Sequence, residues 1–230
     1  MTAVWSAEAR GRRRTGVLGG TFDPFHCGHE AAALNAQRAL SLEHIVLVPS
    51  RQPPHRSTQP LASAADRLAM AHIAAGAQKS WSVSDTELER TGPSYSFDTL
   101  AEFGAQGLAP SEVFFITGSD AFAEIATWSR YPSVLDLANF VVIAREGITL
   151  DSLGNRLPSL AGRMTTPAGF TGAEGTRIIL IDATTPAVSS TEVRRRVQHG
   201  EPITGMVPLA IETYIRDHRL YHTPQSGVGR

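Results

Sequence analysis

The sequence predicts an α/β fold: a single domain built on a doubly wound parallel sheet with helices on both faces. Two observations lead to this fold class. Short apolar runs alternate with longer segments in which apolar residues recur at helical spacing, the pattern of β-α-β units. The alternation continues along the 230 residues without a linker, and this length suits one domain with a substantial core. The expected architecture is therefore Rossmann-like, with ligands bound beyond the carboxyl ends of the strands.

In the N-terminal half, each expected strand is a short apolar run that ends near glycine, proline or polar residues. The strands are expected at residues 15–18 (TGVL), 44–49 (HIVLVP) and within 80–88 (SWSVSDTEL). Segments of helical period follow them, the first rich in alanine and leucine, and predict helices at residues 28–42, 62–77 and 96–106.

The C-terminal half continues this order. Its strands are expected at residues 112–117 (EVFFIT), 139–145 (NFVVIAR) and 177–182 (RIILID). Helices are expected over residues 118–128, 189–197 and 208–218. The segment 147–175 is rich in Gly, Pro and Thr, and it predicts an irregular connection.

Composition and charge narrow the class of protein. With 21 Lys and Arg against 22 Asp and Glu, the net charge of −1 argues against nucleic-acid binding driven by overall charge. The single cysteine, Cys27, excludes an internal disulfide framework and suits a reducing compartment. No apolar run is long enough to span a membrane, and the basic start lacks the apolar core of a signal peptide. We expect a cytoplasmic protein with one domain over residues 12–221 and flexible tails at 1–11 and 222–230, and whether it forms a homo-oligomer is left open.

The segment GGTFDPFHCGH has the composition of a ligand-binding turn. Gly19 and Gly20 follow a strand and carry no Cβ, so backbone can approach a ligand closely. A helix begins near Gly28, and His26 and His29 would flank its N-terminus, where each can donate a hydrogen bond to a phosphate oxygen. A zinc site needs three or four ligands, and H-C-x-H lacks a second pair. A glycine turn with surface histidines is the other alternative, and we favour phosphate binding.

This segment resembles the (H/T)-x-G-H signature of the nucleotidyltransferase superfamily, here H-C-G-H preceded by G-G-T-F-D-P. Three branches compete: class I aminoacyl-tRNA synthetases, pantetheine-phosphate adenylyltransferases and nicotinate-mononucleotide adenylyltransferases. The first would need a K-M-S-K-S-like loop, which the sequence lacks. The second are usually shorter and lack P-P-H and D-T-L segments in the form found here. The closest resemblance is to the bacterial nicotinate-nucleotide adenylyltransferases.

Two loops carry that resemblance on the mononucleotide side. In VPSRQPPHR, a Pro-Pro pair stiffens a loop that holds Arg51, His55 and Arg56 near a strand end, where they could meet a phosphate; a solvated basic loop is the alternative. In GPSYSFDTL, Tyr95 and Ser96 precede a helix whose N–H groups could bind a carboxylate, an ordinary cap by a serine being the alternative. The resemblance associates the pyridine carboxylate with the backbone at Ser96.

Two further segments match the family. In FFITGSDAFAEIATW, Gly118 permits close approach of a ribose or base, Asp120 can accept hydroxyl hydrogen bonds, and Trp128 offers a flat face for a pyridine ring, a core tryptophan being the alternative. In VSSTEVRRRV, S-x-x-E predicts a helix start. Successive helical residues differ by about 100°, so the three arginines cannot all face one ligand. Arg195 and Arg196 are expected on a solvated face. Arg194 matches the family's (I/V)-S-S-T-x-(I/V)-R motif, which is implicated in triphosphate binding.

The resemblance extends from about residue 16 to 221 and implies an enzyme of NAD biosynthesis. It would transfer the adenylyl group of ATP to nicotinate mononucleotide, giving deamido-NAD and pyrophosphate, with Mg²⁺ accompanying ATP. The implied catalytic residues are His26, His29 and Arg194; the ATP-binding residues are Gly19, Gly20, Thr21, Phe22, Gly28, Gly118, Asp120, Ser190 and Thr191; and the mononucleotide-binding residues are His55, Arg56, Tyr95, Ser96 and Trp128. The alternatives are another phosphate acceptor (nicotinamide mononucleotide or phosphopantetheine) and a nucleotide-binding regulator without turnover.

Overall fold

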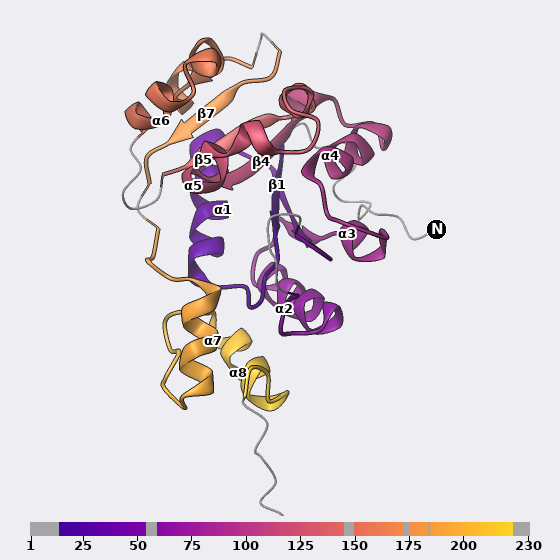
Figure 1. Ribbon diagram of the computed structural model, residues 1–230, viewed down its shortest axis with the longest axis vertical. Coiled ribbons are helices and arrows are strands. Elements are labelled where there is room, and N and C mark those ends of the chain that lie inside the picture. Colours follow the sequence, from indigo (N-terminus) through magenta and orange to yellow (C-terminus); the bar gives the residue numbers. More distant parts are fainter. Residues whose placement is uncertain (1–13, 54–58, 145–149, 173–174, 184, 223–230) are drawn as a thin grey trace, which may run out of the picture.

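Seven parallel strands form one central sheet in the computed structural model, which describes residues 14–53, 59–144, 150–172, 175–183 and 185–222 (Figure 1). The order across the sheet is β3-β2-β1-β4-β5-β7-β6. The strands are β1 Thr15–Gly20, β2 His44–Pro49, β3 Trp81–Val83, β4 Val113–Gly118, β5 Asn139–Ile143, β6 Met164–Thr165 and β7 Ile178–Ile181. The expected doubly wound α/β fold is confirmed.

Helices cover both faces of this sheet. They are α1 Cys27–Leu40, α2 Ala64–Gly76, α3 Thr86–Glu89, α4 Ser96–Ala105, α5 Ser119–Ala123, α6 Leu150–Arg156, α7 Ser190–Gln198 and α8 Leu209–Asp217. Neighbouring strand residues point to opposite faces, so Leu18 packs in one apolar cluster with α1, α2, α7 and α8. Val17 packs in a second cluster with α4, α5 and α6. None of the helices in the described part of the chain has the length and apolar character that crossing a membrane requires.

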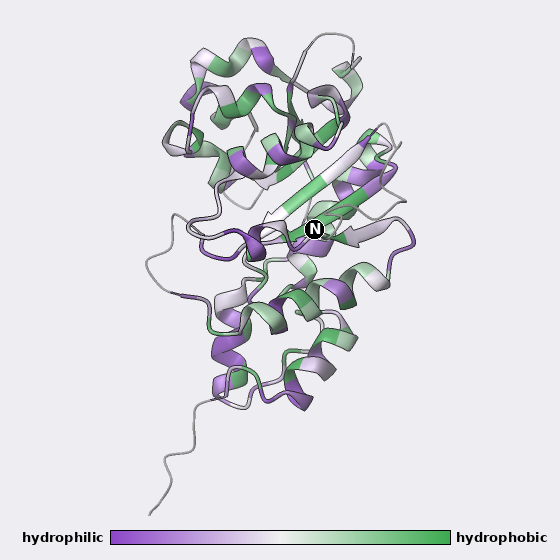
Figure 2. Ribbon diagram, turned by 90° about the vertical axis from the view of Figure 1, so that its right-hand side faces the viewer, coloured by the Kyte–Doolittle hydropathy of each residue, from purple (hydrophilic) through white to green (hydrophobic). Residues whose placement is uncertain are grey.

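Burial on both faces explains why the strands are recognisable in the sequence. Strands covered by helices on each side read as continuous apolar runs, and β2 and β5 are buried along their whole length. Figure 2 shows the same contrast: the central strands are largely hydrophobic, and the helices around them combine hydrophobic and hydrophilic positions.

Two expectations about local structure are wrong. Residues 118–128 do not form one helix, because α5 ends at Ala123 and a 3-10 turn follows over Ile125–Thr127. Phe122, Ile125 and Trp128 are spaced by three residues, which a 3-10 turn places on one side, and all three pack in the second cluster. The strand expected within residues 80–88 is confirmed as β3, and α3 follows it. The segment 147–175 is not irregular throughout, since its described part contains α6 and the edge strand β6.

The topology fixes where a ligand can bind. From β1, the chain proceeds to β2 and β3 on one side of the sheet, and then to β4 and β5 on the other. Ligands of open parallel sheets bind at such a reversal, beyond the carboxyl ends of the strands. Here the reversal separates β1 from β4, which end at Gly20 and Gly118.

Candidate active site

A cavity of about 610 Å³ opens at the carboxyl ends of β1 and β4. Its walls come from the ends of these strands, the starts of α1 and α4, and the segment that leads into α7. Predicted site residues that line it are Gly19, Gly20, Thr21, Gly28, His29, Ser96, Gly118, Asp120 and Trp128. Tertiary structure therefore brings together predicted residues from three of the sequence segments described above.

The turn between β1 and α1 holds Phe22 in an unusual conformation. Its φ of 51° is in the left-handed region, which residues other than glycine rarely adopt. The ring is 1% exposed and lies 5.3 Å from the Phe25 ring and 5.1 Å from the His29 ring, measured between centroids. Burial of this ring stabilises the turn, which carries Gly20 and Thr21 along the cavity wall.

His26 and His29 form a reciprocal cap at the start of α1. The His29 backbone N–H donates to His26 Nδ1, and the His26 backbone N–H donates to His29 Nδ1, at 3.3 Å each. The two rings stack with centroids 3.7 Å apart and an interplanar angle of 17°. Because each Nδ1 accepts a hydrogen bond, each neutral imidazole carries its proton on Nε2. Both rings thus have the tautomer that a donor to an anion through Nε2 requires.

Gly28 is the position where the helix start has no room for a side chain. A Cβ there would lie 3.0 Å from His26 Cε1 and Nδ1 and 3.5 Å from the Pro186 carbonyl oxygen. Pro186 belongs to the segment before α7, which also lines the cavity. A glycine between the two histidines thus permits the stacked pair and the approach of a distant segment.

The start of α4 forms another wall. Tyr95 is its N-cap residue and makes no capping hydrogen bond through its side chain. The alternative of a serine cap is wrong, because the Ser94 hydroxyl accepts hydrogen bonds from the backbone N–H groups of Arg51 (3.0 Å) and Gln52 (3.3 Å). Ser96, the first residue of α4, lines the cavity. This helix therefore presents an N-terminus to the cavity that no side chain of the described residues caps.

Trp128 lies on the same side of the cavity. Its ring meets Phe115 edge-to-face at 5.9 Å and Phe140 at 6.3 Å, so one part of the indole is held by the core. It is also partly exposed and lines the cavity. Trp128 is therefore a boundary residue: one part of its ring packs in the core, and another part faces the cavity.

Helix α7 docks against the β1–α1 turn through two of the predicted triphosphate residues, Ser190 and Arg194. The Ser190 hydroxyl donates to the Pro24 carbonyl at 3.0 Å. Arg194 donates through Nη1 to the Asp23 carbonyl at 2.7 Å and lies 3.8 Å from the Asp23 carboxylate. Its Nη2 donates to Thr191 Oγ1 at 3.3 Å. These contacts place α7 beside the histidine pair, at the margin of the cavity.

The comparisons with known proteins agree with one another. The Cytidylyltransferase-like family model matches residues 17–196. A protein of Acidothermus cellulolyticus, named as a probable nicotinate-nucleotide adenylyltransferase, is 39% identical over 220 residues that cover 94% of this chain and 98% of the relative. A protein of the same name from Moorella thermoacetica is 37% identical over 216 residues, with 94% of each chain covered. The chain belongs to the nicotinate-nucleotide adenylyltransferase family.

Solved structures support the fold assignment of this family member. Nicotinic acid mononucleotide adenylyltransferase of Plasmodium falciparum, complexed with NaAD, is similar with a TM-score of 0.65 and 18% sequence identity. The same enzyme complexed with APC gives a TM-score of 0.67. Each match covers 91% of this chain and 97% of the other, so the likeness extends over the whole fold.

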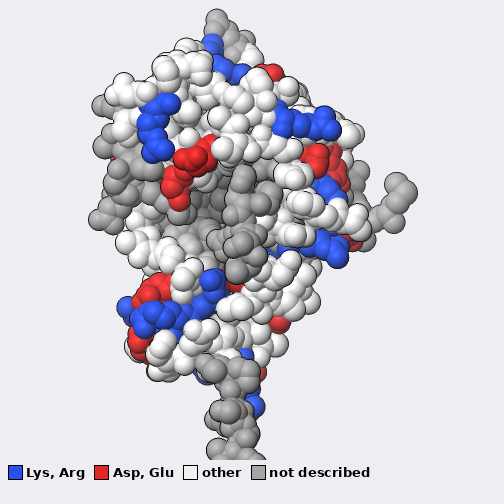
Figure 3. Space-filling view, viewed as in Figure 1, with Lys and Arg blue, Asp and Glu red and all other residues white. Residues whose placement is uncertain are grey.

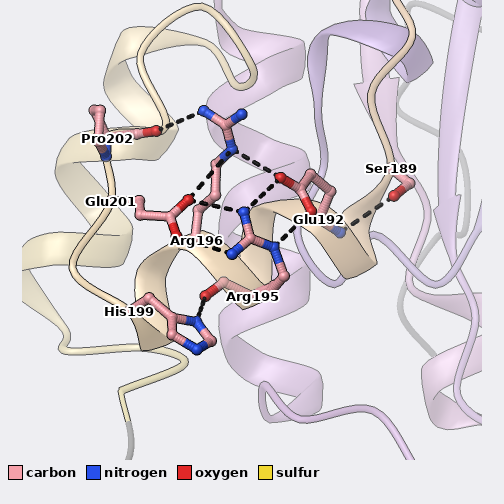
Figure 4. Close-up of polar contacts among 7 residues, drawn as sticks. All are labelled: Ser189, Glu192, Arg195, Arg196, His199, Glu201 and Pro202. Atoms are coloured by element: carbon pink, nitrogen blue, oxygen red, sulfur yellow. Dashed lines mark hydrogen bonds and ion pairs between the residues drawn. The ribbon is translucent and has the colours of Figure 1, made fainter.

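The two arginines that follow Arg194 on α7 lie on a solvated face, as expected. Figure 4 shows Arg195 and Arg196 paired with Glu192 and Glu201. Hydrogen bonds from Arg195 and Arg196 lower the pKa of Glu192 to about 2. Figure 3 shows side chains of both charges gathered over this helix. Glu192 also lines the cavity, so these arginines offset a carboxylate at its edge.

Other predicted residues of this family member lie off the cavity wall or outside the described residues. Phe22 is buried in the core, and Tyr95 precedes α4. His55 and Arg56 lie outside the described residues. The Arg51 guanidinium donates to the carbonyls of Leu88 (3.2 Å) and Arg90 (3.4 Å).

Sequence reasoning missed several cavity residues. They are Leu18, Ala32, Ser50, Pro53, Glu87, Ser94, Phe115, Ile116, Thr117, Ala121, Ile143, Glu192 and residues 185–189. Most are apolar or small and carry no sequence signal for a site. Glu87 is different: it is a carboxylate, only 6% exposed, and it lies within the segment SWSVSDTEL, just beyond β3, as ligand-binding residues often do. Burial, the largest effect, raises the pKa of Glu87.

Proposed function

We propose that this protein transfers the adenylyl group of ATP to the phosphate of nicotinate mononucleotide, giving deamido-NAD and pyrophosphate. The observation that supports this best is that one cavity joins two helix N-termini, at His29 of α1 and at Ser96 of α4. Helix N-termini favour anionic groups. The two substrates bring two such groups, a triphosphate and a pyridine carboxylate. The names of the relatives point to the same pair of substrates.

ATP would bind over the ends of β1 and β4. Because the glycines at these ends carry no Cβ, ATP can approach the protein backbone closely. The Asp120 carboxylate can accept hydrogen bonds from hydroxyl groups of the ribose. The residues proposed for ATP are Gly19, Gly20, Thr21, Phe22, Gly28, Gly118, Asp120, Ser190 and Thr191. Phe22 would act through the position of its ring, since it is buried.

Nicotinate mononucleotide would bind on the α4 side. Its carboxylate would accept hydrogen bonds from backbone N–H groups at Ser96, and its ring would stack on Trp128, next to Tyr95. His55 and Arg56 are proposed for its phosphate. This arrangement would bring that phosphate toward the α-phosphorus of ATP.

The chemistry needs no covalent attachment to the protein. A phosphate oxygen of the mononucleotide forms a bond to the α-phosphorus, and the bond from that phosphorus to the pyrophosphate oxygen breaks. His26 and His29 would donate hydrogen bonds through Nε2 to phosphate oxygens, and Arg194 would add a positive charge. Catalysis then depends on positioning and on stabilising charge at the transferring group.

Mg²⁺ would enter as part of the nucleotide substrate. Within the described residues, no group of three His, Cys, Asp or Glu side chains could hold a metal ion. Mg²⁺ is commonly held by substrate phosphates with few protein ligands, which agrees with this absence.

Pyrophosphate release on mixing the protein with Mg²⁺, ATP and nicotinate mononucleotide tests the proposal. We expect release that requires both substrates. His29→Ala should lower turnover by about 10²–10³, because one preorganised donor is lost. Turnover of this variant equal to wild type would refute the role of His29, and no release by the wild-type protein would refute the function.

Two rival functions are separated by the same assay. An enzyme for another acceptor would prefer nicotinamide mononucleotide or phosphopantetheine over the acid mononucleotide. A nucleotide-binding regulator would bind ATP, as measured by calorimetry, without releasing pyrophosphate from any acceptor. The retention of His26, His29 and Arg194 favours an enzyme.

A further inference from the structure

Glu87 is a buried carboxylate in the cavity wall that the proposed chemistry does not use. It lies in the short helix α3, after β3, and its side chain meets two hydroxyl groups from other segments. Thr99 Oγ1 donates to Glu87 Oε1 at 2.7 Å. The Ser94 hydroxyl faces the same carboxylate, and the interactions of Glu87 with Thr99 and Ser94 favour its charged form. This carboxylate therefore connects the two segments that carry Ser94 and Thr99 to α3.

The Ser94 hydroxyl connects Glu87 to the loop after β2. A hydroxyl has one proton to donate and two lone pairs that accept. Both acceptor positions of Ser94 are used, by the backbone N–H groups of Arg51 and Gln52. The remaining proton is available to the Glu87 carboxylate, whose charged form Ser94 favours. Ser94 therefore connects Glu87 to this loop, which the Arg51 and Arg67 side chains also hold. Ser50 and Pro53 of the loop line the cavity.

The Thr99 hydroxyl connects Glu87 to α4 in the same way. Thr99 lies in the first turn of α4, 1% exposed, and its Oγ1 accepts from Arg90 Nη1 at 3.2 Å. Its proton goes to Glu87. Three residues earlier, Ser96 begins the helix and lines the cavity. Glu87 thus holds the helix start against α3.

We propose that Glu87 is a positioning residue for the mononucleotide half of the cavity, and that it fixes the loop 50–53 and the start of α4 relative to each other. This inference rests on the proposed function, which assigns that half to nicotinate mononucleotide. The ATP half, at the ends of β1 and β4, is not reached by the contacts of Glu87 given above. Loss of the carboxylate should therefore weaken the binding of nicotinate mononucleotide and leave the binding of ATP unaffected.

Glu87→Gln is the variant that tests this, because it keeps the shape of the side chain. One carboxylate oxygen becomes an NH₂ group, which cannot accept from Ser94 or Thr99. We expect KM for nicotinate mononucleotide to rise about tenfold, the effect of losing one charged hydrogen bond. KM for ATP should change by less than about twofold. Ser94→Ala should raise the same KM, and the double variant should be less than additive, because the two residues act through one contact.

Glu102→Gln is the matched control. Glu102 belongs to the same α3–α4 network, since it accepts from Thr86 Oγ1 and from Arg90 Nη2 at 2.6 Å each, but it does not line the cavity. The Glu102→Gln variant should be less stable than wild type, with an unchanged KM for nicotinate mononucleotide. Thermal unfolding of each variant establishes that it is folded before kinetics are measured.

The outcomes separate the two proposals. A rise in the mononucleotide KM for Glu87→Gln and not for Glu102→Gln supports the positioning role. Equal KM values for wild type and Glu87→Gln, or equal rises for both substrates, overturn it and leave the function standing. Absence of pyrophosphate release by wild-type protein refutes the function itself, and with it the substrate named for this half.

Discussion

Gly20→Ala is the substitution whose effect on the active site follows most directly from the geometry. A Cβ on Gly20 would lie 2.8 Å from Phe22 Cε1, whereas ordinary van der Waals contact begins near 3.4 Å. The Phe22 ring must therefore retreat by about 0.6 Å. It has little room to do so, because it is 1% exposed and packed against the rings of Phe25 and His29.

The displacement of the Phe22 ring should lower both the free energy of unfolding and the turnover. Overpacking a buried ring costs about 1–3 kcal/mol of the free energy of unfolding. The ring can retreat only against its neighbours, so the His29 imidazole, 5.1 Å away between centroids, should shift with it. A misplacement of about 1 Å in a reacting geometry costs about 10² in rate, so we expect turnover to fall about ten- to a hundredfold.

Urea unfolding and pyrophosphate release measure the two effects. Gly19→Ala is the stability control, because its Cβ would meet only Phe115, at 3.8 Å, an ordinary contact. Gly104→Ala is the activity control, because Gly104 is exposed on α4 with nothing within 4 Å of the added Cβ. A Gly20→Ala protein as stable as Gly19→Ala and as active as Gly104→Ala would refute the reasoning.

Three further predictions concern stability. Phe140→Ala should lower the free energy of unfolding by about 3–5 kcal/mol, because Phe140 is 0% exposed and packs against the rings of Phe115, Phe122 and Trp128; urea denaturation measures this, and a loss below about 1 kcal/mol would contradict it. The pKa of Glu192, lowered to about 2 from 4.5, means that its ion pairs stabilise the fold above about pH 4.5 and lose this effect as pH falls toward 2. The thermal midpoint of wild type should thus exceed that of Glu192→Gln at pH 7 and converge with it near pH 2, with a smaller difference in high salt because the pair is exposed. The pKa of Glu87 is raised by burial, so the folded state binds its proton more tightly than the unfolded state. Relative to Glu87→Gln, wild type should therefore lose stability as pH rises from about 4.5 through the raised pKa, and a difference independent of pH would argue against a buried carboxylate.

Local physical chemistry makes much of the fold visible in the sequence. Strands buried on both faces must be apolar throughout, so β2 and β5 stand out as HIVLVP and NFVVI. The turn from β1 into α1 is equally local, because His26 and His29 cap the helix through groups three residues apart. For these features, the residues that decide the structure are neighbours in the chain.

Short-range pattern fails where burial overrides helical propensity. Residues 118–128 read as one helix, yet packing of Phe122, Ile125 and Trp128 on one side favours a 3-10 turn after α5. In the glycine-rich segment 147–175, α6 is stabilised by burying Leu153 against the sheet, a contact that composition does not reveal.

The amino-acid sequence by itself determined the fold class, the order of strands along the chain and the segments that supply the site. Tertiary structure alone decided how those segments meet. Arg194 reaches Asp23 across 171 residues, and Ser190 reaches Pro24 across 166. Glu87 likewise lies beside Thr99 and Ser94, and through Ser94 near the loop after β2, only in the folded chain. The physical reason is that periodicity and capping act over a few residues, whereas a cavity wall is set by packing between segments distant in the chain.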